Sequence, residues 1–191
     1  MPNKNKGKNQ IANQETLRCF IAINVPEELK QKIYEIQNKL NSEGIKLIEH
    51  NNLHITLKFL GDTHSKNLSK IEQVLREINF TPFKIHLHRV GVFPDESYVR
   101  VVWIGCDSKE LSILGEKIED VLTGMFRKED LTVHLTIARV KKKIEIHTFL
   151  EQHKNDDFGV FVCTGFELKQ SILDREGPTY STIARFDAKT Q

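Results

Sequence analysis

Residues 53–61 of the chain read LHITLKFLG, an apolar run that contains a histidine and a threonine two positions apart. The alternation predicts a β-strand, in which His54 and Thr56 share one face because successive side chains point to opposite sides. The other face would pack on the core, and the residues expected there are Leu53, Ile55, Leu57 and Phe59. This strand decides the fold because the chain contains it twice.

The second copy begins eighty positions later, where residues 133–139 read VHLTIAR. His134 and Thr136 repeat the spacing of the first pair, and Val133, Leu135 and Ile137 are expected to face the core. In each half of the chain, a predicted strand and helix come before the His-x-Thr strand. A duplication of this kind predicts two lobes with a cleft between them, and ligands favour such interfaces.

The order of the predicted elements fixes the fold class. Strands are predicted over 18–25, 46–49, 53–61, 83–90, 98–105, 133–139, 160–168, 169–173 and 179–186, with helices over 26–43, 65–78, 108–126 and 144–153 and a loop over 91–96. The elements do not alternate as a doubly wound parallel sheet requires. Pairs of strands separated by helices instead predict an α+β fold with antiparallel sheets and flanking helices.

The composition is that of an ordinary globular chain, and its formal net charge is only +2. Residues 1–16 alone carry this excess, so any anion site in the rest of the chain must be a local arrangement. We expect a disordered polar tail over 1–16 and a single bilobal domain over 17–188. Three widely spaced cysteines and the lack of a long apolar run predict a cytoplasmic protein with free thiols and no membrane contact (Cys19, Cys106 and Cys163).

Two histidines on facing strands suit one kind of reaction in particular. Cleavage of a phosphodiester at a ribose needs a base for the nucleophile and an acid for the leaving oxygen, and the ordinary pKa of histidine allows both roles near neutral pH. In-line displacement places the entering and leaving oxygens on opposite sides of phosphorus, which His54 and His134 could serve from two strands. Thr56 and Thr136 would then donate hydrogen bonds to the non-bridging oxygens.

Arg139 could add a cationic donor to the same phosphate. It lies five residues after His134, so an unbroken strand would point it to the opposite face. Contact with the phosphate therefore requires a β-bulge, or a strand that ends near Val140.

The motifs as a set resemble the 2H phosphoesterases, and among them the RNA 2′,3′-cyclic phosphodiesterases that were first described as 2′-5′ RNA ligases. The resemblance covers nearly the whole chain after the tail. It rests on Arg18, Phe20, Ala22, Ile23 and Pro26 in the first strand, on residues 54–61, on Phe93-Pro94, on residues 100–103, on residues 134–139, and on Ser171 and Tyr180 near the end.

The resemblance implies a bilobal α+β fold and the opening of RNA 2′,3′-cyclic phosphate ends to 2′-phosphates without a metal or other cofactor. His54 would be the proton donor and His134 the proton acceptor, with Thr56, Thr136 and Arg139 on the phosphate. Phe20, Tyr180 and Ser171 are possible substrate contacts, and Phe59 is a further aromatic candidate. The substrate would be RNA with a cyclic phosphate end, tRNA fragments included, or a small nucleotide, acted on by a monomer. The resemblance also implies possible 2′-5′ RNA ligase activity.

Two other interpretations stay open. A non-catalytic RNA- or nucleotide-binding module could have the same fold, although binding alone does not need a paired acid and base. A metallohydrolase could use His86 and His88, which share a strand face, although no acidic partner with ligand spacing lies near them in the sequence. The three lysines at 141–143 could contact the RNA backbone or form a solvated turn.

Overall fold

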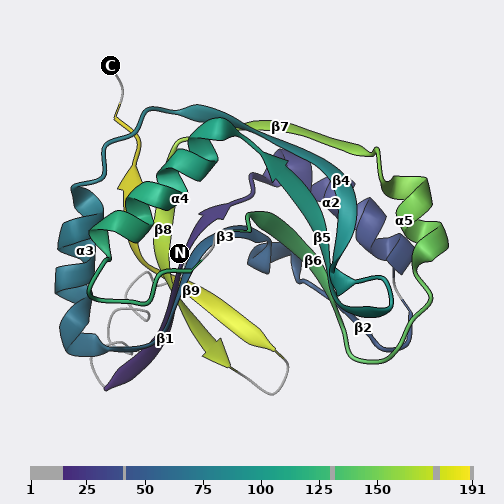
Figure 1. Cartoon of the computed structure of the whole chain (residues 1–191), viewed down its shortest axis with the longest axis horizontal. Coiled ribbons are helices and arrows are strands. Elements are labelled where there is room, and N and C mark those ends of the chain that lie inside the picture. Colours follow the sequence, from purple (N-terminus) through teal and green to yellow (C-terminus); the bar gives the residue numbers. More distant parts are fainter. Residues whose placement is uncertain (1–14, 41, 130–131, 174–176, 190–191) are drawn as a thin grey trace, which may run out of the picture.

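The structure of the chain is a computed structural model that describes residues 15–40, 42–129, 132–173 and 177–189 (Figure 1). The expected disordered tail lies outside these residues, apart from its last two positions. The described elements are β1 (Thr16–Asn24), α2 (Glu27–Leu40), β2 (Ile45–Leu47), β3 (His54–His64), α3 (Leu68–Arg76), β4 (Phe83–Asp95), β5 (Tyr98–Asp107), α4 (Lys109–Val121), β6 (His134–Val140), α5 (His147–His153), β7 (Asp157–Cys163), β8 (Gly165–Leu173) and β9 (Pro178–Asp187).

The strands form one curled antiparallel sheet with the two His-x-Thr strands at its centre. The order is β7-β4-β5-β6-β3-β1-β8-β9, and β2 adds to β6. Strands β3 and β6 join through one registered pair, Ile55 and Leu135, and both of these side chains are fully buried. The central pair divides the sheet into two lobes, one on the side of β3 and the other on the side of β6.

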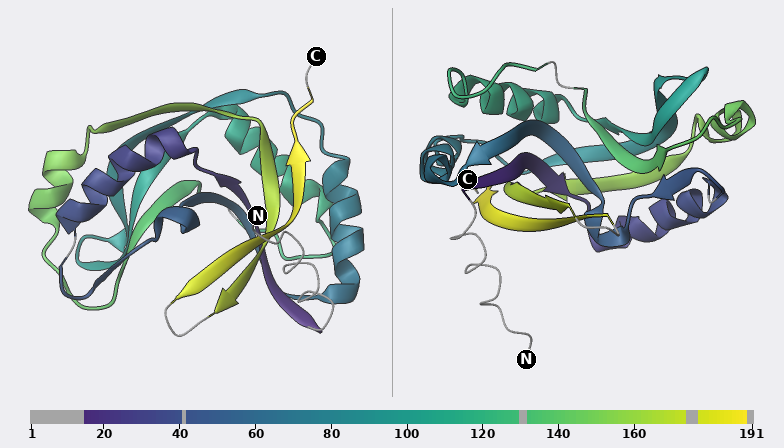
Figure 2. Two further views of the ribbon diagram at one scale, coloured as in Figure 1. Left: turned by 180° about the vertical axis from the view of Figure 1, so that it is seen from behind. Right: turned by 90° about the horizontal axis from the view of Figure 1, so that it is seen from below.

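Each lobe has its own pair of helices. Helix α4 contacts mainly β3, with smaller contacts to α3 and β4, and α3 contacts β9, whereas α2 contacts β6 and β7 and α5 contacts β4 (Figures 1 and 2). Helix α2 therefore follows β1 in the chain but packs on the opposite lobe, and α4 follows β5 and does the same. Their apolar faces recur at helical spacing, as Leu29, Ile33, Ile36 and Leu40 in α2 and as Leu111, Leu114 and Ile118 in α4. No helix in the described ranges is long and apolar enough to cross a membrane.

Both central strands carry a β-bulge at the same place. In β6, Ala138 pairs with Val102 and Thr136 pairs with Trp103, which leaves Ile137 as the extra residue. In β3, Lys58 pairs with Ile21 and Thr56 with Ala22, which leaves Leu57 as the extra residue. Counted from the histidine, the first seven residues of β3 and of β6 therefore show the same sequence of buried, partly buried and exposed positions. The internal repeat therefore extends from the motif to its backbone irregularity.

Each bulge is secured by a side chain from the helix on the same lobe. Gln37 of α2 donates from Nε2 to the carbonyl oxygens of Ile48 and Ile137, at 2.8 Å in each case. In the other lobe, the buried Lys58 donates from Nζ to Glu119 Oε1 of α4 at 2.7 Å and to the Arg127 carbonyl at 2.9 Å. These contacts satisfy polar groups that a bulge leaves inside the protein.

The bulges correct one sequence prediction. Phe59 was expected to face the core, but its side chain is 58% exposed. The extra residue at Leu57 shifts the alternation by one, so Lys58 is buried and Phe59 turns outward. The predicted loop over 91–96 was also wrong, because β4 continues through Asp95. The chain breaks between β7 and β8 at Thr164, not after Leu168 as predicted.

Candidate active site

Four polar side chains surround the central pair of the sheet. Since Ile55 and Leu135 are paired and face the core, their neighbours on either side face the opposite way. Extending the antiparallel register by one residue places His54 opposite Thr136 and Thr56 opposite His134. The two histidines therefore lie on one diagonal of a square and the two threonines on the other.

The two imidazoles are oriented by matching hydrogen bonds. His54 Nδ1 lies 2.6 Å from the carbonyl oxygen of Asn52, and His134 Nδ1 lies 2.7 Å from that of Thr132. A carbonyl oxygen only accepts, so each Nδ1 donates its proton. In the neutral ring the Nε2 atom then carries the free lone pair. Each histidine is thus fixed by a residue two positions before it, with Nε2 left for a ligand.

Burial lowers the pKa of both histidines. The pKa of His54 falls to about 4, chiefly because burial disfavours its charged form, and the positive charges of Lys169 and Arg139 add to the effect, as does His134 when it is protonated. The pKa of His134 is lowered for the same reason, with Arg139 as the nearby cation. Both imidazoles are therefore neutral at pH 7 in the free protein, and a positive field surrounds them.

Aromatic rings line the site on both sides. The rings of Phe20 and Tyr180 lie 5.0 Å and 5.1 Å from that of His54, centroid to centroid, and the Phe93 ring lies 5.0 Å from that of His134. Phe20 is buried, so it forms a wall, whereas Tyr180 is half-buried and Phe59 is exposed. The exposed ring of Phe59 lies 6.4 Å from that of Phe20 and offers a face to a planar group.

Arg139 and the threonines are available to an anion. The bulge at Ile137 gives Arg139 the same parity as His134 and Thr136, which is the irregularity that the sequence required. Within the described part of the chain, Arg139 has no ion pair and neither threonine hydroxyl has a hydrogen-bond partner. A cavity of about 200 Å³ opens beside Thr56 and His134, and Phe59, Thr132, Glu119 and Glu129 are among its other lining residues.

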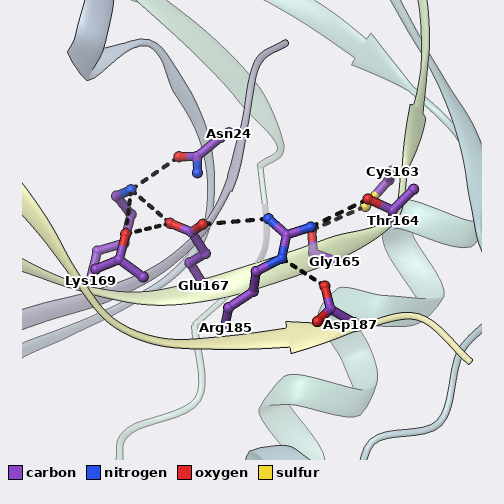
Figure 3. A network of polar contacts seen from close by, with 9 residues as sticks. Asn24, Cys163, Thr164, Gly165, Glu167, Lys169, Arg185 and Asp187 are labelled. Atoms are coloured by element: carbon purple, nitrogen blue, oxygen red, sulfur yellow. Dashed lines mark hydrogen bonds and ion pairs between the residues drawn. The ribbon is translucent and has the colours of Figure 1, made fainter. Parts of the chain in front are cut away.

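A second cation reaches the site from β8. Lys169 is buried, and its Nζ donates to Asn24 Oδ1 at 3.0 Å and to Glu167 Oε2 at 2.9 Å (Figure 3). Asn24 pairs with His54 across β1 and β3, and Lys169 pairs with Phe20 across β1 and β8. Glu167 also accepts from Thr182 at 2.7 Å and lies 3.5 Å from Arg185.

Burial raises the pKa of Glu167, but hydrogen bonds from Thr182 and Lys169 outweigh this and hold it below the usual value. The carboxylate is therefore ionised, and it balances the charge of Lys169 where the two groups are buried together. The network fixes the ammonium group of Lys169 beside the pair of Asn24 and His54.

Several known proteins resemble this chain in sequence and in fold. Residues 23–103 match the family named LigT like phosphoesterase. An RNA 2′,3′-cyclic phosphodiesterase of Archaeoglobus fulgidus is 38% identical over 176 residues, which cover 90% of this chain and all of that protein. One of Methanocaldococcus jannaschii is 38% identical over 172 residues, with coverages of 87% and 98%.

The chain belongs to the LigT-like phosphoesterase family. The crystal structure of a Thermus thermophilus protein, TT0787, superposes on this phosphoesterase with a TM-score of 0.80 at 26% identity, covering 90% of this chain and 97% of that one. The predicted α+β fold with a pseudo-duplicated antiparallel sheet is confirmed.

The structure places the other candidate residues of the phosphoesterase as follows. Ser171 pairs with Tyr180 across β8 and β9 and with Arg18 across β1, next to the aromatic wall. His86 and His88 stack on β4 with their ring centroids 4.9 Å apart. His86 lies 3.1 Å from Asp157 and His88 lies 2.6 Å from Asp107, so the two histidines use different carboxylates.

Three residues of the phosphoesterase site were not predicted as site residues from the sequence: Asn24, Phe93 and Lys169. Phe93 and Lys169 occupy matching places in the two lobes. Phe93 lies on β4, which pairs with β5, the neighbour of the central strand β6. Lys169 lies on β8, which pairs with β1, the neighbour of the central strand β3. The internal repeat was visible only in the two central strands, and no motif continued it to the outer ones. A signal for Lys169 did exist, since it is the only cation in its strand, whose first six residues are all buried.

Proposed function

We propose that the protein hydrolyses RNA 2′,3′-cyclic phosphate ends to 2′-phosphates by two-histidine acid–base catalysis, without a metal. The arrangement of His54, Thr56, His134 and Thr136 around one strand pair carries the proposal. Relatives that match almost their full length are named RNA 2′,3′-cyclic phosphodiesterases, which supports the same substrate class.

In the proposed reaction, His134 Nε2 accepts a proton from water as the water oxygen attacks phosphorus. The bond from phosphorus to O3′ breaks, and His54 Nε2 donates a proton to that oxygen. The product is a 2′-phosphate with a free 3′-hydroxyl, and one water molecule is consumed. Each histidine is expected to contribute about 10²- to 10⁴-fold to the rate.

The role of His54 as acid depends on the bound substrate. With a pKa of about 4, His54 is neutral in the free protein at pH 7 and has no proton on Nε2 to donate. A bound phosphate brings a negative charge next to the imidazole, and an opposite charge raises the pKa of a histidine. The substrate would therefore help to protonate the group that cleaves it.

The remaining residues are assigned to the phosphate and the base. Thr56 and Thr136 would donate to the two non-bridging oxygens, and Arg139 would balance the charge that develops on them. Phe59 and Tyr180 would contact the terminal base or ribose, since aromatic side chains stack on unpaired bases. Phe20 supports His54 from the buried side, and Ser171 would act through Tyr180.

Hydrolysis of a nucleoside 2′,3′-cyclic phosphate tests the proposal. His54→Ala and His134→Ala should each lower kcat by at least about 10²-fold, whereas His86→Ala should leave it unchanged. Activity that survives both changes in the central strands would refute the mechanism, and loss of activity in the His86 variant would favour the metallohydrolase. Full activity is expected in EDTA.

Product analysis tests the leaving group. Chromatography against authentic 2′- and 3′-phosphates should show only the 2′-phosphate, and a 3′-phosphate product would contradict donation to O3′. A non-catalytic binding module would bind the nucleotide with no product at all.

Ligation is the same displacement with another nucleophile. A 5′-hydroxyl in place of water would attack the cyclic phosphate and join two RNA strands through a 2′-5′ bond. Incubation of a nicked RNA that carries a cyclic phosphate and a 5′-hydroxyl, tRNA halves included, would show whether the cyclic phosphate is hydrolysed or the strands are joined.

An RNA substrate of this kind and the three free cysteines support a cytoplasmic location.

A further inference from the structure

A second cavity lies where β6 ends, and its charged lining residues are all basic. The basic cavity has a volume of about 270 Å³ and is lined by residues 97–100 and 141–144. Its cations are Arg100, Lys141, Lys142 and Lys143, and all four side chains are exposed. This gathering of charge is local, because the chain as a whole is close to neutral.

Most of these cations have no acidic partner in the described ranges. Lys142 forms an ion pair with Glu43, but Lys141, Lys143 and Arg100 form none. The Arg100 guanidinium lies 4.8 Å from the centre of the Tyr98 ring, which holds it at the cavity by a cation–π contact.

The acidic residues closest in sequence are engaged elsewhere. Glu145 accepts a hydrogen bond from the His147 backbone amide at 3.1 Å, Asp95 accepts hydrogen bonds from Ser97, and Glu96 lies 3.0 Å from His147 Nδ1. Asp95 and Glu96 line the neighbouring cavity beside α5, and none of the three lines the basic cavity. Three positive charges therefore remain for a ligand.

The basic cavity continues the phosphate site along the same two strands. Lys141 follows Arg139 by two residues, and Arg100 precedes Val101, which is the β5 partner of Arg139. Arg139 itself lowers the pKa of His54 and His134 by its charge, so it lies near both. The cationic side chains thus run from Arg139, beside the two histidines, to the basic cavity.

We propose that the basic cavity binds the sugar–phosphate backbone of the RNA strand on the 5′ side of the cyclic phosphate. This inference rests on the proposed function, because a strand that ends in a cyclic phosphate continues from the site as a polyanion. Lys141, Lys143 and Arg100 contact its phosphates, which gives affinity without sequence preference. The cavity therefore favours an oligonucleotide over a mononucleotide as substrate.

The double variant Lys141→Gln/Lys143→Gln tests this, with Lys142 kept so that its ion pair with Glu43 remains. The matched control is Lys70→Gln/Lys109→Gln, which removes two exposed lysines from α3 and α4. KM is measured for an RNA oligonucleotide with a 2′,3′-cyclic phosphate end and for the corresponding mononucleotide. The ratio of the oligonucleotide KM to the mononucleotide KM should rise several-fold in the first variant and stay at the wild-type value in the control.

Salt dependence gives a second measurement. The slope of log affinity against log salt concentration should lose about 0.7 for each phosphate contact removed, and so about 1.4 in the double variant. Fluorescence anisotropy with a labelled RNA oligonucleotide measures this slope without turnover. An unchanged KM ratio together with an unchanged slope would overturn the inference, and an acidic protein partner would then be the better occupant.

The two proposals fail in different ways. A wild-type protein that binds the RNA through these lysines but never opens the cyclic phosphate would refute the proposed function alone. A protein that opens it equally well with and without the lysines, on both substrates and at all salt concentrations, would refute the basic cavity alone.

Discussion

Gln37 and Glu119 occupy matching positions on α2 and α4, and each is tied to the bulge of a different His-x-Thr strand. Gln37 donates to the carbonyl of Ile137 at 2.8 Å, and Glu119 accepts from Lys58 at 2.7 Å. Both side chains are buried, and each comes one residue after a fully or almost fully buried isoleucine, Ile36 or Ile118. The two helices thus fix the local backbone that turns Arg139 and Phe59 toward the site.

Gln37→Leu should weaken the bulge of β6. Removal of the amide leaves the Ile137 carbonyl with the Ile48 amide as its donor, at 2.9 Å, and a lost buried hydrogen bond costs about 1–2 kcal/mol. We expect this loss in the free energy of unfolding, measured with urea, together with a higher KM because Arg139 is less well held. Gln31→Leu on the exposed face of α2 is the control, and an equal effect there would contradict the explanation.

Lys58→Met should destabilise the protein more strongly. The change leaves Glu119 as a buried carboxylate without its cation, which typically costs about 3–5 kcal/mol. The double variant Lys58→Met/Glu119→Leu should recover part of this loss, because no buried charge remains. Urea unfolding of the wild type, the single variant and the double variant measures these free energies. A double variant less stable than Lys58→Met would contradict the explanation by an unpaired buried charge.

The stability of the protein should fall as the pH falls from about 6.5 toward 4. His54 has a folded-state pKa of about 4 against 6.5 for the ordinary group, so the unfolded chain binds the proton first on acidification. The loss from His54 amounts to roughly 3 kcal/mol at most, at 1.36 kcal/mol per pKa unit. His54→Gln should remove this part of the pH dependence, which thermal melting at several pH values would show.

His147 provides the control for that measurement. Its hydrogen bond to Glu96 raises its pKa, so its contribution to stability is present below the ordinary pKa and is lost as the pH rises through the folded value. His147→Gln should therefore change the profile in the opposite direction. If the difference in stability between wild type and His54→Gln did not change from about pH 4 to 7, the pKa of His54 would not be lowered in the folded protein.

Lys169→Met should raise the pKa of His54. The ammonium group is one of the positive charges that disfavour the protonated imidazole, and its removal relieves that repulsion. Titration of the histidine ring protons by NMR would show the upward shift, with His134 less affected. Lys84→Met, at an exposed lysine of β4, is the control. An unchanged pKa of His54 in the Lys169 variant would show that the Lys169 ammonium group lies too far from the imidazole to affect it.

The pH dependence of catalysis should differ between free and bound enzyme. The profile of kcat/KM reports the groups of the free enzyme, in which the pKa of His54 is low, and that of kcat reports the complex. A bound phosphate raises this pKa, so the basic limb of kcat should lie at higher pH than that of kcat/KM. If the basic limbs of the kcat and kcat/KM profiles lay at the same pH, the bound phosphate would not raise the pKa of His54.

Much of the fold was accessible from the sequence because its signal is local. The alternation in residues 53–57 and 133–137 fixed which residues are buried, and the order of strands and helices indicated an antiparallel α+β protein. The same alternation failed at Phe59, because a bulge breaks the period of two and nothing in the residues themselves marks where. At Arg139, the chemistry of the site required such a break, so the irregularity could be inferred there.

The partners of His54 were harder to foresee. Lys169 reaches the histidine across β1, through a pairing of strands that are separated by more than a hundred residues. Such contacts depend on the strand order, which local patterns do not specify. The hydrogen bonds to the carbonyls of Asn52 and Thr132 are local, but they depend on backbone directions that residue types alone do not reveal.

The exchange of α2 and α4 between the lobes has a consequence for folding. Each lobe combines segments from both halves of the chain, so a cut between β4 and β5 would yield two fragments that each lack part of both cores. We therefore propose that residues 17–188 form a single cooperative domain, which should melt in one calorimetric transition with the measured enthalpy equal to the van't Hoff enthalpy. Neither fragment should fold until the other is added, and fluorescence of Trp103 would then follow their reassembly.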